Sequence, residues 1–249
     1  MKALVTGASS GIGREIALYL SRLGYDLYVV SRDKKKLEKV FQGCKGKVTS
    51  IELDLRYSDC CYQLYQLLHG KNIDILVNNA GFGDCGNFTE TDLEKEFDMI
   101  DLNIRAYHIL MKLFLRDFVK RGYGRILNIG SMAGVMPGPY MATYYATKAY
   151  IVNLSLAVAE ELKLDDSKVK LSVFCPGPVK TEFSKVANVH FKIGSLIALE
   201  AARCAVDGMF LNQMLIIPNN MRVSYVLVKV APKSLVLRVN AMIQERVSK

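Results

Sequence analysis

The sequence predicts an α/β fold, with a single doubly wound, parallel β-sheet of about seven strands and helices on both faces. Short runs rich in Val, Ile and Leu alternate with longer amphipathic stretches, which is the pattern of strands connected by helices. Because no internal repeat, low-complexity segment or Pro/Gly/Ser-rich linker interrupts this alternation, residues 1–249 are interpreted as one domain.

Strands and helices are expected to alternate in a regular order. The expected strands cover residues 2–6, 26–30, 47–53, 73–78, 124–129, 170–175 and 214–218, and the expected helices lie near 11–23, 33–43, 57–70, 89–121, 142–164 and 196–211. Parallel strands joined by helices cross over right-handedly, and ligands bind beyond the carboxyl ends of such strands. We therefore expect the functional residues directly after strands.

A glycine-rich stretch, TGASSGIG at Thr6–Gly13, joins the first expected strand to the first helix. Its glycines allow a tight turn and a close backbone approach, and the free N–H groups of the following helix favour a pyrophosphate. The spacing is G-x-x-x-G-x-G rather than the common G-x-G-x-x-G, and such a turn can also be mere chain reversal. Its place at the first strand-to-helix turn favours a dinucleotide site.

The end of the second strand indicates which dinucleotide is bound. An acidic residue there would bind the adenosine ribose hydroxyls, whereas an arginine would accommodate a 2′-phosphate. Ser31 and Arg32 occupy these positions, and Asp33 is expected to cap the next helix. The sequence favours NADP(H) over NAD, with an ordinary solvated charge as the alternative interpretation of Arg32.

Two tyrosine–lysine pairs have the spacing Y-x-x-x-K, Tyr144 with Lys148 and Tyr225 with Lys229. Residues four apart share a helix face, so the ammonium can favour the ionised phenol, which then acts as a general acid or base. The spacing occurs too easily by chance to decide alone. Ser131 lies thirteen residues before Tyr144 and directly after an expected strand, whereas Tyr225 has no such partner. Tyr144 is therefore the expected catalyst.

From its start to about Thr181 the chain resembles the short-chain dehydrogenase/reductase family, which has a Rossmann fold. The matching motifs are TGASSGIG, LDL, NNAG, DLNIRA, YYATK and PGPVKT, all in the family's order. The resemblance implies a catalytic tetrad of Asn103, Ser131, Tyr144 and Lys148. It also implies cofactor contacts at Thr6, Gly7, Ser9, Ser10, Gly11, Ile12, Gly13, Ser31, Arg32, Asp54, Leu55, Asn79, Ala80, Gly81, Tyr144, Lys148, Pro176, Gly177, Val179 and Thr181.

The resemblance implies an NADP(H)-dependent carbonyl reductase or alcohol dehydrogenase that interconverts a ketone or aldehyde and its alcohol. Tyr144 would exchange a proton with the substrate oxygen, and Ser131 would hydrogen-bond that oxygen. Lys148 would bind the nicotinamide ribose and lower the Tyr144 pKa by its charge, and Asn103 would position a proton-relaying water. The alternative is a catalytically silent NADP-binding sensor or interaction protein.

After Thr181 the resemblance weakens, in a substrate-variable segment at about 182–197. This segment offers Phe183, Val186, Val189, Phe191 and Ile193, which indicates either an apolar substrate, such as a 3-oxoacyl or steroid-like ketone, or simple core packing.

The C-terminal extension, about 219–249, replaces the glycine-rich ending of many tetrameric family members, so we expect a homo-oligomer and favour a dimer. After Pro232 an amphipathic helix is expected, with Leu235, Val239 and Met242 on one face and Gln244 pointing elsewhere. We expect this helix to dock on the domain or on a partner subunit, and peripheral contact with an anionic membrane is the alternative.

The overall composition narrows the partners and the compartment. The net charge is +9, but the basic tail lacks the aromatic residues of a single-strand binder, so no nucleic acid is expected beside the small-molecule substrate. The six cysteines form no C-x-x-C pair and are interpreted as reduced, mostly buried thiols. The three histidines are scattered without the spacing of metal ligands, so no metal site is expected. With no signal peptide and no membrane-spanning run visible, we expect a cytoplasmic protein.

Overall fold

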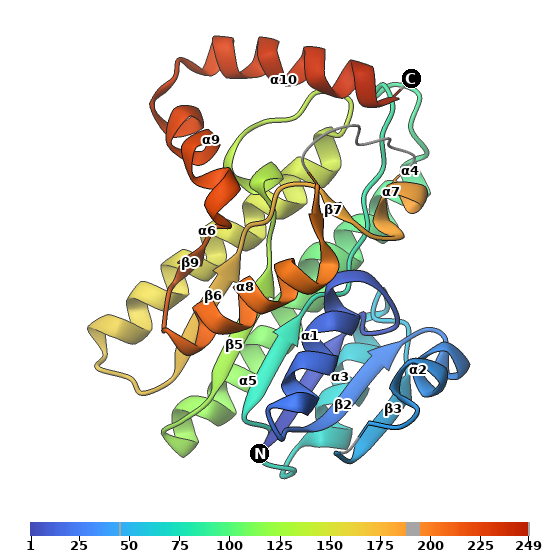
Figure 1. Cartoon of the computed structure of the whole chain (residues 1–249), viewed down its shortest axis with the longest axis vertical. Helices are drawn as coiled ribbons and strands as arrows, with labels where there is room; N and C mark the ends of the chain where they lie inside the picture. Colours follow the sequence, from blue (N-terminus) through green and yellow to red (C-terminus); the bar gives the residue numbers. More distant parts are fainter. Residues whose placement is uncertain (45, 188–194, 249) are drawn as a thin grey trace.

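The computed structural model describes residues 1–44, 46–187 and 195–248, and its centre is a seven-stranded parallel sheet (Figure 1). The strand order is β3-β2-β1-β4-β5-β6-β9. The strands are β1 (Lys2–Thr6), β2 (Asp26–Ser31), β3 (Val48–Glu52), β4 (Ile75–Asn78), β5 (Arg125–Ile129), β6 (Lys170–Phe174) and β9 (Leu215–Ile216). Each of the seven overlaps a strand expected from the sequence, so the Rossmann-like α/β fold is confirmed.

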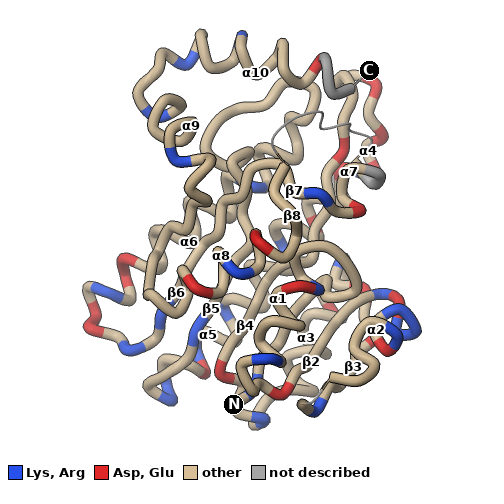
Figure 2. The backbone as a smooth tube through the Cα atoms, in the orientation of Figure 1, with Lys and Arg blue, Asp and Glu red and all other residues tan. Residues whose placement is uncertain are grey.

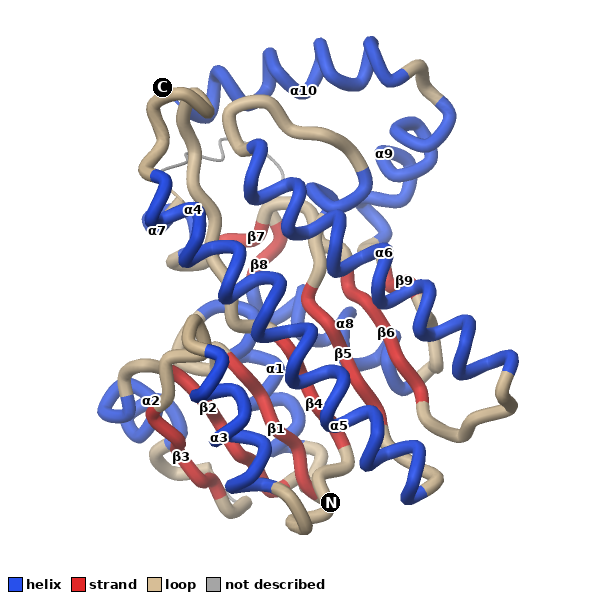
Figure 3. Tube along the Cα trace, turned by 180° about the vertical axis from the view of Figure 1, so that it is seen from behind, coloured by secondary structure: helices blue, strands red, loops and turns tan. Residues whose placement is uncertain are grey.

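Helices cover both faces of the sheet because its strands are apolar on both sides. One face carries α1 (Gly11–Arg22), α2 (Lys34–Phe41) and α8 (Ala198–Phe210), whose buried residues form one core with the strands. The other face, turned to the viewer in Figure 3, carries α3 (Ser58–Leu68), α5 (Tyr107–Arg121) and α6 (Ala142–Leu164). The chain reverses its direction across the sheet between β1 and β4, which places the ligand site at their carboxyl ends.

The expected helix at 89–121 begins later and has three parts. Asp92 caps its start, accepting hydrogen bonds from the backbone N–H groups of Glu94 at 2.8 Å and Lys95 at 3.2 Å. The helix runs as α4 (Leu93–Ile100), a π-helical turn η1 (Asp101–Ala106) and then α5. Such π-turns often occur at functional sites, and this one contains Asn103.

Several elements were not expected from the sequence. They are the 3₁₀ turn η2 (Met132–Val135), the short helix α7 (Phe183–Val186), a parallel pair of strands β7 (Val179–Lys180) and β8 (Leu196–Ile197), and the helix α9 (Asn219–Val230). Helix α10 (Lys233–Ser248) follows Pro232, as expected. Helices α9 and α10, which we call the roof, lie over the carboxyl end of the sheet (Figure 1). Among the described helices, none is both long and apolar enough to cross a bilayer.

Candidate active site

A cavity of about 1420 Å³ is lined by residues beyond the carboxyl ends of the strands and by residues of the roof. It extends from the glycine-rich loop and the end of β2, past the ends of β4, β5 and β6, to residues of α6, α9 and α10. Its volume is sufficient for a dinucleotide and a substrate together. The cavity therefore lies at the edge of the sheet where ligand binding was expected.

The glycine-rich loop fits closely against the end of β4. Gly7 has a φ of +64°, and a Cβ there would lie 2.8 Å from the Cα of Ala80. A Cβ on Gly13 would lie 2.2 Å from Nδ2 of Asn79, which donates to the backbone oxygens of Thr6 at 3.0 Å and Gly7 at 3.1 Å. Asn79 thus holds the glycine-rich loop in place, in addition to being an expected cofactor contact.

This loop suits a pyrophosphate group. Ser10, which precedes α1, makes no side-chain cap hydrogen bond, so the first N–H groups of the helix have no side-chain acceptor. These N–H groups and the positive end of the helix dipole favour an anion at this point, and the glycines let it approach the backbone. The residues present therefore fit a dinucleotide.

The end of β2 is arranged as the sequence predicted. Asp33 caps α2, accepting from the backbone N–H of Lys36 at 2.8 Å, and the hydroxyl of Ser31 accepts from the backbone N–H of Asp33 at 3.0 Å. Arg32 is exposed and lines the cavity. Because the Asp33 carboxylate caps α2, Arg32 is the charged side chain at the end of β2 that is available to a group on the ribose.

Asp54, one of the expected cofactor contacts, has its carboxylate held by Arg56. Arg56 donates from Nη2 at 2.6 Å and from Nε at 3.0 Å, and it also pairs with Asp98. Burial favours the neutral carboxyl, but the hydrogen bonds and charge of Arg56 outweigh it and lower the Asp54 pKa. Asp54 and Leu55 both line the cavity, and the Asp54 side chain is already paired within the protein.

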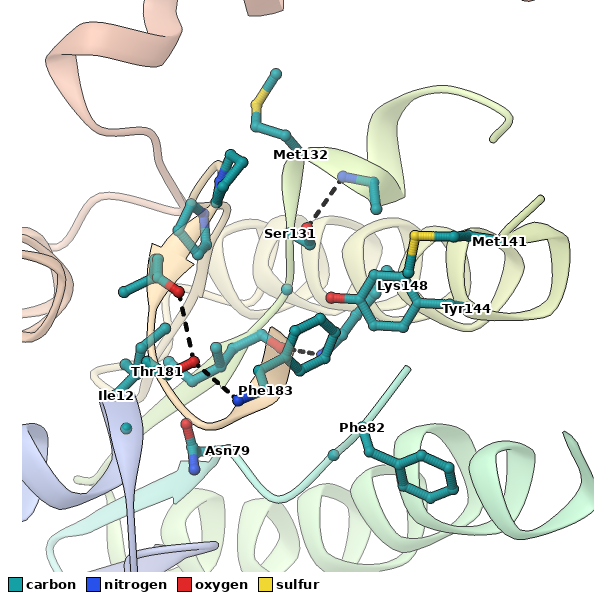
Figure 4. Close-up of a pocket in the computed structure, with 18 of the residues that line it drawn as sticks. Ile12, Asn79, Phe82, Ser131, Met132, Met141, Tyr144, Lys148, Thr181 and Phe183 are labelled. Atoms are coloured by element: carbon teal, nitrogen blue, oxygen red, sulfur yellow. Dashed lines mark hydrogen bonds between the residues drawn. The ribbon is translucent and has the colours of Figure 1, made fainter. Parts of the chain in front are cut away.

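Three of the four tetrad residues meet at the floor of the cavity, where Figure 4 shows Ser131, Tyr144 and Lys148 together. Ser131 caps the η2 turn, and its oxygen accepts from the backbone N–H of Ala133 at 3.1 Å. Tyr144 lies on the first turn of α6, with its ring centroid 5.3 Å from that of Phe183. Lys148, one turn later, donates to the backbone oxygen of Ile129 at the end of β5, at 2.9 Å.

Burial sets the protonation of this pair. It raises the pKa of the Tyr144 phenol above its ordinary value, and a hydrogen bond from Ser131 offsets only part of the rise. Burial also lowers the Lys148 pKa to about 8. The expected lowering of the Tyr144 pKa by Lys148 is therefore wrong for this structure: the Lys148 Nζ lies 5.9 Å from the Tyr144 ring centre, and desolvation dominates.

Asn103 lies beside the cavity and does not line it. Its side chain is fully buried, donates to the backbone oxygen of Phe82 at 2.8 Å and to the Thr147 hydroxyl at 3.1 Å, and accepts from the backbone N–H of Phe82 at 3.1 Å. A Cβ on Gly81 would lie 2.7 Å from Oδ1 of Asn103 and 3.8 Å from Nζ of Lys148. In this arrangement Asn103 joins the loop after β4 to α6.

The loop after β6 closes the other side of the groove. The backbone oxygen of Pro176 accepts from the backbone N–H of Met132 at 2.9 Å. Thr181 accepts from the backbone N–H of Phe183 at 3.2 Å and lies against the glycine-rich loop, because a Cβ on Gly11 would be 3.1 Å from its methyl group. The segment 176–181 therefore runs from the η2 turn to the glycine-rich loop along the edge of the cavity.

The chain matches the family model described as short chain dehydrogenase over residues 1–190, which is most of its length. The chain belongs to the short-chain dehydrogenase family. The matched segment contains all four tetrad residues and every expected cofactor contact.

Several family members are similar in sequence. The very-long-chain 3-oxoacyl-CoA reductase of Mycosarcoma maydis is 36% identical over 178 residues, which are 68% of this chain and 51% of that protein. The Neurospora crassa protein of the same name is 32% identical over 77% of this chain and 60% of its own length. The chain thus spans only part of these relatives. The 3-oxoacyl-(acyl-carrier-protein) reductase of Haemophilus influenzae is 33% identical, with 81% of this chain and 83% of that protein covered.

Solved structures of family members share the fold. A short-chain dehydrogenase from Sphingobium yanoikuyae in complex with NADPH has a TM-score of 0.82 and 30% identity, with 90% of this chain and 91% of that chain covered. A bulky-bulky ketone specific alcohol dehydrogenase from Comamonas testosteroni has a TM-score of 0.80 and 27% identity, with 94% and 93% covered. The likeness extends beyond the segment that the family model matches.

The roof supplies cavity residues that the sequence did not predict. Gln244 points elsewhere than the half-exposed face of Leu235, Val239 and Met242, as expected: its side chain is buried, and its Nε2 donates to the Tyr145 hydroxyl at 2.6 Å. Asn240 is also buried and donates to the backbone oxygen of Pro137 at 2.8 Å. These long-range polar contacts have no periodic signal in the sequence. The roof docks on the body of the molecule through them.

Other expectations about single residues have mixed outcomes. Tyr225 and Lys229 lie on α9 and do not line the cavity, which removes that pair as a candidate. All six cysteines are free, but only Cys61 and Cys175 are buried, so the expectation of mostly buried thiols is wrong. Within the described residues no group of potential ligands could hold a metal ion. Phe183 lines the cavity, whereas Val189, Phe191 and Ile193 lie outside the described residues.

Proposed function

We propose that the protein is an NADP(H)-dependent reductase of ketones, working on an apolar substrate of the 3-oxoacyl type. The observation that carries this proposal is the meeting of Tyr144, Ser131 and Lys148 at the floor of a cavity that is bounded by a dinucleotide-binding loop on one side and by apolar side chains on the other.

The two hydroxyl groups suit the reduction of a carbonyl. Because burial raises the Tyr144 pKa, the phenol keeps its proton at neutral pH and can give it to a carbonyl oxygen. The Ser131 oxygen is oriented by the Ala133 N–H, and the Ser131 O–H, which bonds to Tyr144 in this structure, can donate to the same carbonyl oxygen when a substrate is bound. Lys148, held by the Ile129 carbonyl, lies where it can bind ribose hydroxyls. Bound NADPH would supply the hydride.

NADPH is favoured over NADH by the charges near the end of β2. Arg32 lines the cavity and is exposed, and its positive charge helps to lower the Asp54 pKa. Lys36 also lines the cavity, where it pairs with Glu182 at 2.7 Å. An arginine fork is well suited to the 2′-phosphate that distinguishes the two dinucleotides. The similar structure from Sphingobium yanoikuyae, which contains NADPH, supports this choice.

The substrate class follows from the lining beyond Tyr144. That part of the cavity is formed by apolar side chains of Met136, Met141, Phe183, Val228, Val236 and Ile243. Such a surface suits an acyl chain or another extended apolar group next to the ketone. The names of the Mycosarcoma maydis and Haemophilus influenzae relatives agree in the 3-oxoacyl group, which supports a 3-oxoacyl thioester.

The test is NADPH consumption with 3-oxoacyl thioesters of increasing chain length and with cyclic ketones. Tyr144→Phe removes the proton donor, so kcat should fall by about 10²- to 10⁴-fold while NADPH binding persists. Tyr225→Phe is the matched control, because it removes a hydroxyl from the other Y-x-x-x-K pair, and it should keep full activity.

Two results would contradict the proposal. One is full activity of the Tyr144→Phe protein. The other is NADPH binding by the wild-type protein without consumption of any ketone in the panel, which would favour a silent, cofactor-binding protein.

A further inference from the structure

The outward side of the roof carries apolar side chains that nothing in the described structure covers. Five of them are exposed and do not line the cavity: Val223 71%, Val226 56%, Val230 74%, Leu237 39% and Met242 52%. Together with the exposed bases Arg222, Lys229, Lys233 and Arg238 they form what we call the roof surface. Apolar side chains gathered in this way mark a site of interaction.

Helix α10 leaves part of its apolar face uncovered. Its polar side chains Asn240 and Gln244 are buried, at 5% and 6% exposure, and bond to the body of the molecule. Leu235 and Val239 line the cavity and are 53% and 46% exposed, whereas Met242, on the same face of the helix, is 52% exposed and does not line the cavity. Apolar side chains exposed beside a cavity in this way suit contact with an apolar environment.

The roof is mainly basic, and Glu245 is the one acidic residue in α9 and α10. From Asn219 to Gln244 the sequence contains four basic residues and no Asp or Glu. Figure 2 shows these bases spread along α9 and α10. In α9, Val223, Val226 and Val230 are three and four residues apart, so they form a stripe on one face of the helix. Arg222 and Lys229, seven residues apart, lie along the border of this stripe. Apolar residues bordered by bases match a bilayer with anionic head groups.

We propose that the roof surface docks the protein on an anionic membrane, with α9 and α10 lying in the interface plane. No described helix is suited to cross the bilayer, so the contact is peripheral. A second copy of the chain fits less well. In a symmetric dimer through this face the basic roof surface would lie against its own copy, and like charges would oppose the contact.

Docking would also bring the cavity to the membrane. Leu235 and Val239 both line the cavity and are about half exposed, so they lie at its rim. A lipid-like substrate could pass from the bilayer to Tyr144 between these apolar side chains. The docking itself does not depend on the reaction that the site performs.

The experiment is flotation of the NADPH-bound protein with phosphatidylcholine vesicles, with and without phosphatidylserine. The wild-type protein should float with the anionic vesicles, and less of it should do so at high salt. Val223→Glu/Val230→Glu should lower the partition coefficient by on the order of tenfold. Lys229→Gln/Arg238→Gln should lower it by about fivefold per charge, on anionic vesicles alone.

The matched control is Leu164→Glu/Leu211→Glu, which alters side chains that are 76% and 70% exposed on the body of the molecule. It should bind vesicles nearly as well as the wild-type protein. Because neither valine lines the cavity, the thermal midpoint and NADPH affinity of Val223→Glu/Val230→Glu should match those of the wild type.

The proposal would be overturned if the wild-type protein did not float with the vesicles, or if the roof and control variants lost equal amounts of vesicle binding. It would also be overturned if light scattering showed a concentration-dependent dimer that Val223→Glu/Val230→Glu converts to monomers. The last would assign the roof surface to a second copy of the chain.

Discussion

At the residue scale, the site depends on a few side chains whose neighbours fix their orientation. Tyr144 and Lys148 are on one helix face, Ser131 is held by the N–H of Ala133, and Lys148 is held by the carbonyl of Ile129. The reacting groups are thus positioned by backbone atoms of β5, η2 and α6, which are rigid elements. This explains why Lys148, four residues after Tyr144, and Ser131, thirteen residues before it, form a single site with it.

Arg32 permits a direct test of cofactor choice. Arg32→Asp replaces a cation at the cavity edge with an anion, which would repel a 2′-phosphate and accept ribose hydroxyls. The ratio of kcat/KM for NADPH to that for NADH should fall by about ten- to a hundredfold, the effect of one charge-assisted hydrogen bond. Arg22→Asp makes the same charge change away from the cavity and should leave the ratio unaltered. An unchanged ratio in Arg32→Asp would show that Arg32 is an ordinary surface charge.

At the element scale, the sequence predicted the strands and helices that pack in the core. The seven strands were found because their apolar runs are continuous, and the long helices because their apolar residues recur at helical spacing. The helix α9 was missed, because it buries none of its residues and therefore has no apolar face directed to the core. The two-residue strands β7 and β8 were missed because elements so short have no period.

The roof should open more easily than the sheet. Its contacts include the hydrogen bonds from Asn240 to Pro137 and from Gln244 to Tyr145, and α9 has no buried residue. Asn240→Ala/Gln244→Ala leaves the Pro137 carbonyl and the Tyr145 hydroxyl without these partners, at a cost of about 1–3 kcal/mol each. Amide exchange within residues 233–248 should accelerate, while exchange in the sheet stays unchanged.

Ser234→Ala is the control for this prediction, because Ser234 is exposed on the same helix. It should leave the exchange rates as they are in the wild-type protein. Equal acceleration in the roof and in the sheet would mean instead that the two polar contacts stabilise the whole molecule.

At the scale of the whole molecule, the sequence predicted the position of the site better than its surroundings. Residues after strands, such as Asn79 and Ser131, lie at the ligand edge because the topology puts them there. The burial of Gln244 and the exposure of Met242 depend on how α10 lies against distant residues, which no local pattern records. The raised Tyr144 pKa has the same origin, since burial is a property of the assembled fold.

The free energy of unfolding should include a cost for burying the Lys148 ammonium group. Its pKa is about 8 in the folded protein and 10.5 ordinarily, so the folded state holds this proton less tightly than the unfolded state. The cost is complete below pH 8 and disappears as pH rises to 10.5, because only the unfolded state is protonated in that window. Lys148→Met, which removes the charge, should therefore raise the free energy of unfolding at pH 7 by up to about 2 kcal/mol, because the pKa shift corresponds to about 3.4 kcal/mol and the lost bond to Ile129 offsets about 1.5–3 kcal/mol of it. Urea unfolding of the cofactor-free proteins should show this difference shrinking between pH 8 and 10.5, and Lys229→Met, which removes an exposed lysine of α9, is the control. A Lys148→Met protein less stable than the wild type at pH 7, with a difference independent of pH, would mean that Lys148 is not a buried, strained cation.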